Sequence, residues 1–335
     1  MSSSDPDAVT PPAAVTAGRS HQGLLAVLGP TATGKSALGL ALAERYGGEI
    51  VSCDSAAVYR GFDIGTDKVT NRERRGIPHH LVDVANPADT YTAAQYARDA
   101  SAAIFAIHGR GRLPILVGGT GFYYRALARG LFPGPGGDRD LRARLRRIAE
   151  HRGVGLLHRM VRRVDPASAA RIQPGDGMRL VRALEVYFLT GRPLTAHFAE
   201  TASPLGAMPI VAVAVRLPAE DLGRRIARRV DAQFERGLLD EVRGLLARGV
   251  PEDAQPFRGL VYRQVLELLH GVRSETDTRE LIIRENRRYA RRQLIWFRKE
   301  PNLVWFEGAG ESPGTIAKVA EWCDARVADC GVWRA

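Results

Sequence analysis

Eight residues near the start of the chain constrain its fold more than any other feature: Gly29-Pro30-Thr31-Ala32-Thr33-Gly34-Lys35-Ser36. They match the pattern G-x-x-x-x-G-K-S, in which backbone N–H groups surround a phosphate and the next helix points its positive end at it. The apolar run Leu24–Leu28 precedes this loop, and apolar residues at helical spacing follow it as far as Tyr46. Strand, phosphate loop and helix are the expected opening of a parallel α/β sheet. Lys35 would supply a mobile positive charge and Ser36 a ligand for Mg²⁺.

Further strands and helices are predicted along the chain. Buried strands are indicated at 49–52, 113–117, 208–217 and 302–308, and helices at 91–108, 219–248 and 280–299. Between 139 and 200 the sequence is helical, rich in arginine and poor in strand signals. The fold class is therefore α/β, a P-loop NTPase-like parallel sheet core with an inserted helical domain. The predicted boundaries are a disordered tail at 1–22, a discontinuous core at 23–137 and 205–320, the helical insertion at 138–204, and a C-terminal tail at 321–335.

Charge and cysteine content narrow the possible partners and compartment. The chain of 335 residues has 48 Lys+Arg against 37 Asp+Glu, a net charge of +11. Either arginines cover solvated faces, or the partner is a polyanion such as a nucleic acid. Three cysteines without a CxxC pair favour a reducing cytoplasm over a disulfide framework or a zinc site. The tail at 1–22 lacks the apolar core of a signal peptide, and no apolar run is long enough to span a membrane.

The loop alone does not say which phosphate it binds. A nucleotide-hydrolysing enzyme should carry an Asp after a second apolar strand, but "LPILVGGTG" at 113–121 ends in glycine and threonine. Asp83 follows only a short segment that begins with His79 and His80, for which a structural or hydrogen-bonding role is expected rather than a metal site. Asp54 follows the strand at 49–52 and is either a helix N-cap or a general base close to the phosphate loop.

Six motifs occur in one order: "GPTATGKS", "CDSAAVYRGFDIGTDK", "GIPHHLVDV", "PILVGGTGFYYRAL", "RALEVYFLTGRP" and "YARRQLIWFRK". Together they resemble the tRNA dimethylallyltransferases, also called tRNA isopentenyl transferases, from about residue 23 to 306. The resemblance implies that the loop binds dimethylallyl diphosphate with Mg²⁺, and that the prenyl group goes to N6 of adenosine 37, beside the anticodon. It implies catalytic roles for Asp54 as general base, for Thr120 against the diphosphate, and for Arg229 as a diphosphate clamp, with Arg228 next to it.

The same resemblance implies the tRNA contacts, which would bind the anticodon stem-loop to a monomeric enzyme. They are Asp54, Ser55, Ala56 and Ala57 after the second strand, Thr120, and in the insertion Arg142, Met178, Arg179, Leu180, Val181 and Arg182. Because aromatic residues are few in this part of the insertion, its arginines suit phosphate contacts more than base stacking. In the C-terminal "ENRRYARRQLIWFRKE", Tyr289, Trp296 and Phe297 are expected to pack in the core.

Three positions depart from the family pattern. Val261 stands where glycine is usual and puts a backbone turn in question, because valine disfavours positive φ. Asn286 replaces a threonine, and Ala57 replaces a longer side chain, which affects tRNA affinity rather than chemistry. Three alternatives stay open: an adenylate isopentenyltransferase acting on free AMP, ADP or ATP, a P-loop small-molecule kinase, and a non-catalytic RNA-binding protein. The set of tRNAs modified and any later modification of the product are not predicted.

Overall fold

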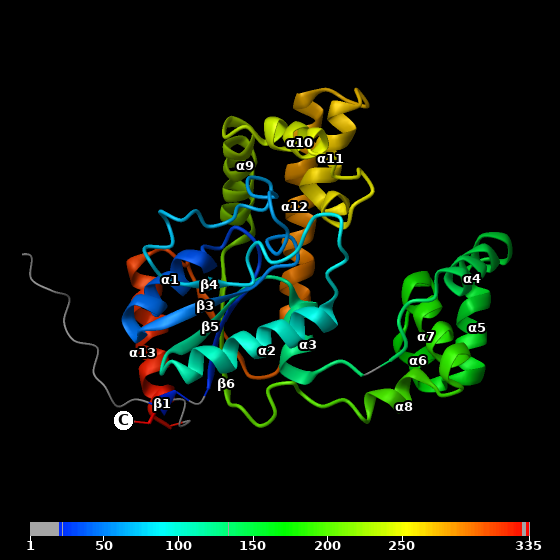
Figure 1. The fold of residues 1–335 in the computed structure, drawn as a ribbon, viewed down its shortest axis with the longest axis horizontal. Helices are drawn as coiled ribbons and strands as arrows, with labels where there is room; N and C mark the ends of the chain where they lie inside the picture. The colour runs from blue at the N-terminus through cyan, green and yellow to red at the C-terminus, as the bar shows by residue number, and fades with distance from the viewer. Residues whose placement is uncertain (1–19, 22, 133, 330–332, 335) are drawn as a thin grey trace, which may run out of the picture. The chain divides into compact units, whose positions relative to one another are not determined.

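The computed structural model describes residues 20–21, 23–132, 134–329 and 333–334 (Figure 1). The predicted tail at 1–22 lies outside these residues except for Ser20 and His21, which form strand β1 and pair antiparallel with β8 (Trp333–Arg334). The chain divides into two compact units, Arg125–Ala207 and the remainder. Among the described residues, no helix combines the length and apolar character needed to cross a bilayer.

The larger unit is built on a sheet of six parallel strands. They are β2 (Leu24–Leu28), β3 (Gly48–Cys53), β4 (His79–His80), β5 (Leu113–Gly118), β6 (Ile210–Arg216) and β7 (Leu303–Glu307), in the order β4-β3-β5-β2-β6-β7. The central strands are apolar along their length because helices cover both faces of the sheet. The predicted α/β fold class is confirmed.

Helices pack on both faces of this sheet (Figure 1). On one face α1 (Lys35–Tyr46) and α13 (Pro313–Asp329) share a core with alternate residues of β2, β3, β5 and β6. On the other face lies α2 (Ala93–Gly109), whose Tyr96, Ile104 and Ile107 are buried. The helix α3 (Gly121–Arg129) begins directly after β5.

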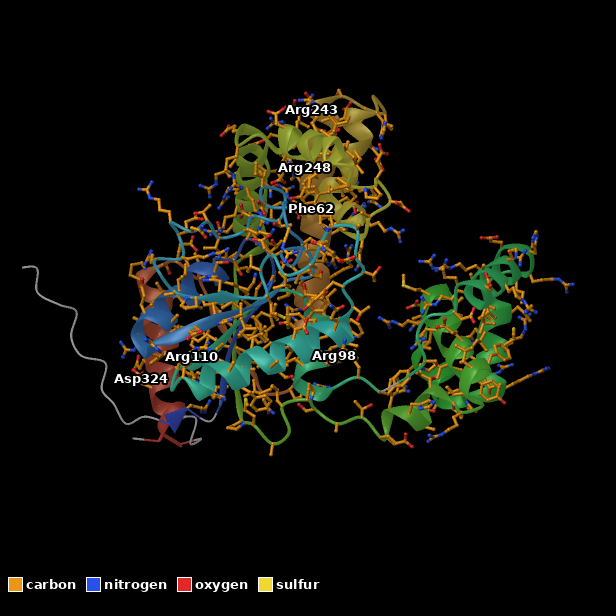
Figure 2. The ribbon with its side chains drawn as sticks, in the orientation of Figure 1. Phe62, Arg98, Arg110, Arg243, Arg248 and Asp324 are labelled. Atoms are coloured by element: carbon orange, nitrogen blue, oxygen red, sulfur yellow. The ribbon has the colours of Figure 1, made fainter. Side chains whose placement is uncertain are left out.

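The predicted C-terminal tail at 321–335 is wrong, since α13 continues through its first nine residues as far as Asp329. Val319, Ala320 and Cys323 lie on one face of this helix and are buried against the sheet. Asp324 on the same helix pairs with Arg45 of α1 at 2.6 Å (Figure 2).

Four helices and a short 3-10 turn complete the larger unit: α9 (Ala219–Glu235), α10 (Leu238–Ala247), η1 (Gln255–Arg258), α11 (Leu260–Leu269) and α12 (Glu275–Phe297). The single helix predicted at 219–248 is in fact two, because Gly237 adopts a left-handed conformation with φ of 90° between α9 and α10. The turn questioned at Val261 is absent, since this valine lies buried inside α11 and has no positive φ. Phe62, from the loop after β3, packs edge-to-face on Phe257 and Tyr262 (Figure 2).

The described residues of the smaller unit form helices and connecting loops, with no strand. It contains α4 (Arg139–Arg152), α5 (Val154–Val164), α6 (Pro166–Arg171), α7 (Gly177–Thr190) and α8 (Leu194–Phe198), packed around a core of leucine and valine. It begins at Arg125 rather than the predicted 138 and ends at Ala207 rather than 204. Ser203 Oγ donates to the Leu127 carbonyl at 3.2 Å, which joins the two ends of the unit.

Candidate active site

Three loops meet at the carboxyl edge of the sheet because three neighbouring strands end in register. Gly118, the last residue of β5, is paired with Leu28 of β2 on one side and with Cys53 of β3 on the other. The residues that follow, Gly29, Gly119 and Asp54, therefore leave the sheet side by side. This is the edge at which parallel α/β folds place ligands.

The phosphate loop after β2 has the backbone geometry that its glycines predict. Gly29 and Gly34 have positive φ, and a Cβ on Gly29 would approach the Val215 carbonyl oxygen to 2.6 Å. The Pro30 carbonyl accepts a hydrogen bond from the fully buried Thr33 hydroxyl at 2.9 Å and another from Lys35 Nζ. The loop is thus held open by its own side chains, with the N-terminus of α1 directed at its centre.

Lys35 lies in a buried, positively charged environment. Burial lowers the pKa of its ammonium group to about 7, and the Arg229 guanidinium acts in the same direction, against the opposing charge of Asp54. A bound anion would restore the charged form of such a group. Lys35 is therefore suited to a ligand that brings concentrated negative charge.

Asp54 is placed one residue beyond β3 and lines the same cavity. Its Oδ1 accepts hydrogen bonds from the backbone N–H groups of Ala56 at 2.8 Å and Ala57 at 3.2 Å. This turn resembles the capping role considered from the sequence. Because both bonds reach the same oxygen, Oδ2 is the atom available for acid–base chemistry.

Thr120 stands beside Asp54 in the glycine-rich turn between β5 and α3. Its hydroxyl oxygen accepts from the Ser55 N–H at 3.1 Å, and its own N–H donates to the Cys53 carbonyl at 3.1 Å. Tyr289 of α12 reaches the same place and lines the cavity. Burial and the nearby Asp54 charge raise the pKa of Tyr289 to about 12, so its hydroxyl keeps its proton at neutral pH.

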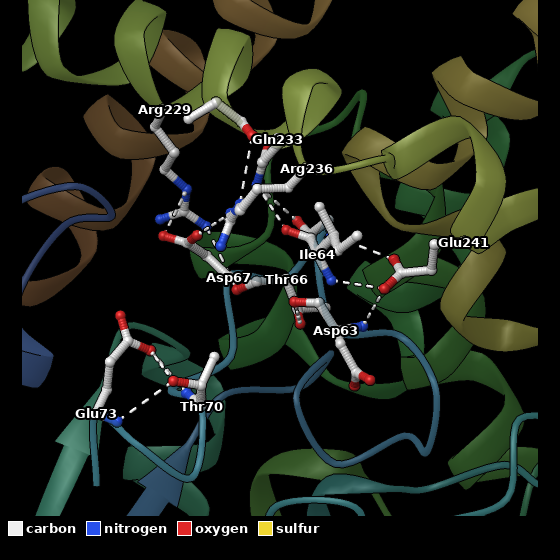
Figure 3. Close-up of polar contacts among 12 residues, drawn as sticks. Asp63, Ile64, Thr66, Asp67, Thr70, Glu73, Arg229, Gln233, Arg236 and Glu241 are labelled. Carbon is white, nitrogen blue, oxygen red and sulfur yellow. Dashed lines mark hydrogen bonds and ion pairs between the residues drawn. The ribbon is translucent and has the colours of Figure 1, made fainter. Parts of the chain in front are cut away.

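Arginines of α9 face the phosphate loop. Arg229 Nη1 donates to Thr31 Oγ1 at 2.9 Å, and the same guanidinium approaches the Thr66 carbonyl and the Asp67 carboxylate at 3.4 Å (Figure 3). Arg228 is exposed, although it also borders the cavity. Of the adjacent pair considered from the sequence, Arg229 is thus the one in contact with the loop.

The segment that carries Thr66 and Asp67 is itself held by helices α9 and α10 (Figure 3). Glu241 accepts from the N–H groups of Asp63 at 2.9 Å and Ile64 at 2.7 Å. Asp67 pairs with Arg236 at 2.6 Å as well as with Arg229. These contacts fix the far wall of the cavity.

The cavity bounded by these groups has a volume of about 1090 Å³. Its wall is strongly basic, with Lys35, Lys68, Arg72, Arg75, Arg225, Arg228, Arg229 and Arg236, while its acidic groups are Asp54, Asp67, Glu73 and Glu311. Such a surface is complementary to a phosphate-bearing ligand.

The donor set fits a magnesium ion bound jointly by the protein and substrate phosphates better than one bound by protein side chains alone. Within the described ranges, no three or more His, Cys, Asp or Glu side chains are grouped to hold a metal. Mg²⁺ commonly binds through one or two protein oxygens together with substrate phosphates, and Ser36 lines the cavity where such a ligand is needed. His80 instead bonds Glu49 at 2.7 Å, and His79 Nδ1 lies 2.9 Å from the Ile77 carbonyl.

In the helical unit, the predicted tRNA residues have different surroundings. Met178 is 83% exposed and the Arg179 side chain 74% exposed near the start of α7. Leu180 and Val181 are buried in the core of the unit. Arg142 and Arg182 both bond the buried Glu185, so part of their charge is neutralised within the unit. Met178 and Arg179 are therefore the side chains of this stretch most open to a partner.

The cavity residues that were not predicted from the sequence as site residues include Arg225, Tyr289 and Gln293. Arg225 Nε donates to the Ala32 carbonyl at 2.8 Å, and its position one helical turn before Arg229 was a usable signal. Tyr289 was expected in the core but is half-buried in the cavity wall. Gln293 lies one turn after Tyr289, and no local pattern indicates its partners.

Comparison with known proteins agrees with this geometry. A sequence model described as IPP transferase matches residues 57–300. The tRNA dimethylallyltransferase of Solibacter usitatus is 48% identical over 293 residues, covering 87% of this chain and 94% of the relative. That of Geobacter metallireducens is 45% identical over 298 residues, covering 88% and 96%.

Solved structures give the same result. The full-length tRNA isopentenylpyrophosphate transferase from Bacillus halodurans has a TM-score of 0.69 and 36% identity, covering 92% of this chain and 97% of its own. A eukaryotic dimethylallyltransferase acting on tRNA has a TM-score of 0.74 and 26% identity, covering 91% and 79%. As its motifs predict, the chain belongs to the IPP transferase family.

Proposed function

We propose that this protein transfers the dimethylallyl group of dimethylallyl diphosphate to the exocyclic N6 of adenosine 37, beside the anticodon of tRNA, and releases diphosphate. The observation that carries the proposal is the meeting of a phosphate loop and Asp54 around one basic cavity, at the ends of β2 and β3, the two strands that flank β5. Relatives named for this reaction on tRNA, with matching length, support it.

The acceptor needs help because the N6 lone pair of adenine is delocalised into the ring. Asp54 orients the amino group and takes its proton as the new carbon–nitrogen bond forms. Thr120 holds the backbone at Ser55 and so fixes the position of the neighbouring Asp54. The Tyr289 hydroxyl stays protonated and is a hydrogen-bond donor in the same wall.

On the opposite side, the leaving diphosphate gains negative charge as the carbon–oxygen bond breaks. Lys35, Arg229 and the loop N–H groups stabilise that charge in a site already arranged to receive it. Ser36 would hold Mg²⁺ together with the diphosphate, and the ion would supply further charge neutralisation. Arg225 holds the Ala32 carbonyl and thereby the curvature of the loop.

The tRNA must present its adenine out of the stack for Asp54 to reach it. Exposed Arg179 and Met178 of the helical unit, with Arg142 and Arg182, contact the anticodon stem-loop, while Asp54 to Ala57 and Thr120 line the path of the base. Since one chain carries both the phosphate loop and Asp54, a monomer is sufficient for the reaction.

The test is label transfer from radioactive dimethylallyl diphosphate, with Mg²⁺, to three acceptors in parallel: tRNA with an unmodified adenosine beside the anticodon, AMP and ATP. Label in tRNA alone is the expected result. Label in AMP or ATP would instead make the protein an adenylate isopentenyltransferase. No label in any acceptor would overturn prenyl transfer and favour a kinase, which a phosphoryl-transfer assay with ATP would then detect.

A further inference from the structure

A glutamine from a distant helix joins the two loops that build the site. Gln293 lies in α12, more than 170 residues from either partner. Its Oε1 accepts from the Thr31 N–H in the phosphate loop at 2.9 Å, and its Nε2 donates to the Gly119 carbonyl at 2.8 Å. The residue is only 8% exposed. One amide thus spans the phosphate loop and the glycine-rich turn.

The chemistry of the two partners fixes how this amide is oriented. The Thr31 N–H is only a donor and the Gly119 carbonyl only an acceptor, so the bridge needs an acceptor and a donor on one planar group. Glutamine provides both. The fit is also tight, because a Cβ on Gly119 would lie 2.5 Å from Nε2. The absence of a side chain at Gly119 leaves the space that the amide fills.

The bridge is one link in a chain of hydrogen bonds between the two halves of the reaction. At one end Thr31 also accepts from Arg229, which faces the phosphate loop. At the other end Gly119 precedes Thr120, whose hydroxyl holds the Ser55 N–H next to Asp54. Gln293 therefore stands between the groups that hold the leaving diphosphate and the group that takes the proton.

We propose that Gln293 is a positioning residue that sets the distance between the diphosphate site and Asp54. It acts through Thr31 and Gly119, because Oε1 bonds the phosphate loop and Nε2 bonds the glycine-rich turn. The inference rests on the proposed function. When the bridge is lost, each loop keeps its own ligand-binding groups, but the two substrates no longer meet at the reacting separation.

The test replaces Gln293 by methionine, which has similar length, no charge and neither hydrogen bond. In the full-length protein, three quantities are measured: kcat for transfer to tRNA, KM for dimethylallyl diphosphate, and the affinity for pyrophosphate with Mg²⁺ by calorimetry. A displacement of about 1 Å between reacting groups costs about 100-fold in rate. We expect a kcat loss of that order, with KM and pyrophosphate affinity each changed by less than about threefold.

The matched control is Gln264→Met, at another buried glutamine of the same unit, whose Oε1 accepts from Arg273 at 2.7 Å. It should keep kcat within about twofold of wild type, because it alters packing without touching either loop. A second variant, Gln293→Asn, keeps both polar atoms but is one methylene shorter, and should show the same split between kcat and KM with a smaller loss.

Two results would overturn the inference. One is a folded Gln293→Met protein with kcat within about threefold of wild type. The other is a kcat loss matched by an equal loss of pyrophosphate affinity, which would make Gln293 part of the diphosphate site or of general stability. If the wild-type protein itself transfers no label to tRNA, it is the proposed function that fails. Pyrophosphate binding then distinguishes that failure from a failure of the inference about Gln293.

Discussion

At the scale of single residues, the proposed function divides the reaction between Asp54 and Lys35. They line one cavity, and the charge of Asp54 opposes the lowering of the Lys35 pKa by burial. The proposal assigns Asp54 to the acceptor and Lys35 to the leaving group, so substitutions should separate transfer from diphosphate binding.

The first prediction concerns Asp54→Asn, which keeps an Oδ1 acceptor for the Ala56 and Ala57 N–H groups but removes the base. Transfer to tRNA should fall by about 10²–10⁴-fold, while pyrophosphate affinity changes by less than about threefold. Single-turnover transfer and calorimetry measure the two effects, with Asp253→Asn, on an exposed loop, as the control. Equal loss of transfer and binding would show that Asp54 is a metal-binding or structural residue.

Lys35→Ala should have the reverse profile, because its charge serves the diphosphate. Pyrophosphate affinity should fall first, by at least about tenfold, since a buried charge-assisted hydrogen bond is lost. The same calorimetric titration measures it. Unchanged affinity would contradict the role assigned to this lysine.

Glu185 gives a prediction about pH. Burial alone would raise the pKa of this carboxyl, but hydrogen bonds from Arg142 and Arg182 and from the Asp138 N–H outweigh it and hold the pKa below its ordinary value. A lowered folded-state pKa means that the stabilisation is present above the unfolded pKa of about 4.3 and is lost as pH falls through the folded pKa.

Glu185→Gln should therefore destabilise the helical unit near neutral pH. The difference in stability between wild type and variant should shrink as the pH falls below about 4. Urea unfolding, monitored through hydrogen exchange of peptides from 125–207 at a series of pH values, measures the difference in stability between the two proteins. A difference that does not shrink on acidification would assign the destabilisation to packing rather than to the ion pairs.

At the scale of elements, helix ends decide where the active-site arginines point. Gly237, the N-cap of α10, has φ of 90°, and this break after α9 lets α10 turn back so that Glu241 reaches the segment beside Arg229. Gly237→Ala should cost about 1–2 kcal/mol, because a side chain disfavours the left-handed conformation. Urea denaturation measures the cost, and Gly249→Ala, also at positive φ but in a loop beyond α10, is a matched control for local strain. A stabilised Gly237→Ala protein would mean that the continuous helix expected at 219–248 is accessible.

At the scale of the whole molecule, the net charge of +11 and the exposed arginines make salt dependence the informative property. Affinity for tRNA should fall steeply between about 50 and 200 mM salt, because each arginine–phosphate contact releases counterions. Arg179→Ala should reduce the steepness of the log–log slope by about 0.7–0.9, the value of one contact. Arg45→Ala, at the end of α1 away from the phosphate loop, should leave the slope unchanged. A flat salt response of the wild type would remove the role proposed for the helical unit.

The local motifs were enough to predict the α/β class, the family and the position of the phosphate loop. This is because glycine spacing and apolar strands act over a few neighbouring residues: Gly29 and Gly34 take the positive φ that the loop pattern requires. Asp54 could be singled out for the same reason, since it directly follows a predicted strand.

Other features depended on contacts between distant segments. Which arginine of the Arg228–Arg229 pair contacts Thr31 depends on how α9 is rotated against the loop. The helix at 313–329 packs against a sheet whose strands come from distant parts of the chain, so its own residues do not reveal this contact. Gln293 is the clearest case, since its role exists only where α12 brings it between Thr31 and Gly119. The sequence by itself determined which chemical groups the site contains, because backbone geometry is local. Only the tertiary structure decided how they are spaced and joined, because hydrogen bonds between distant segments form after the chain has packed.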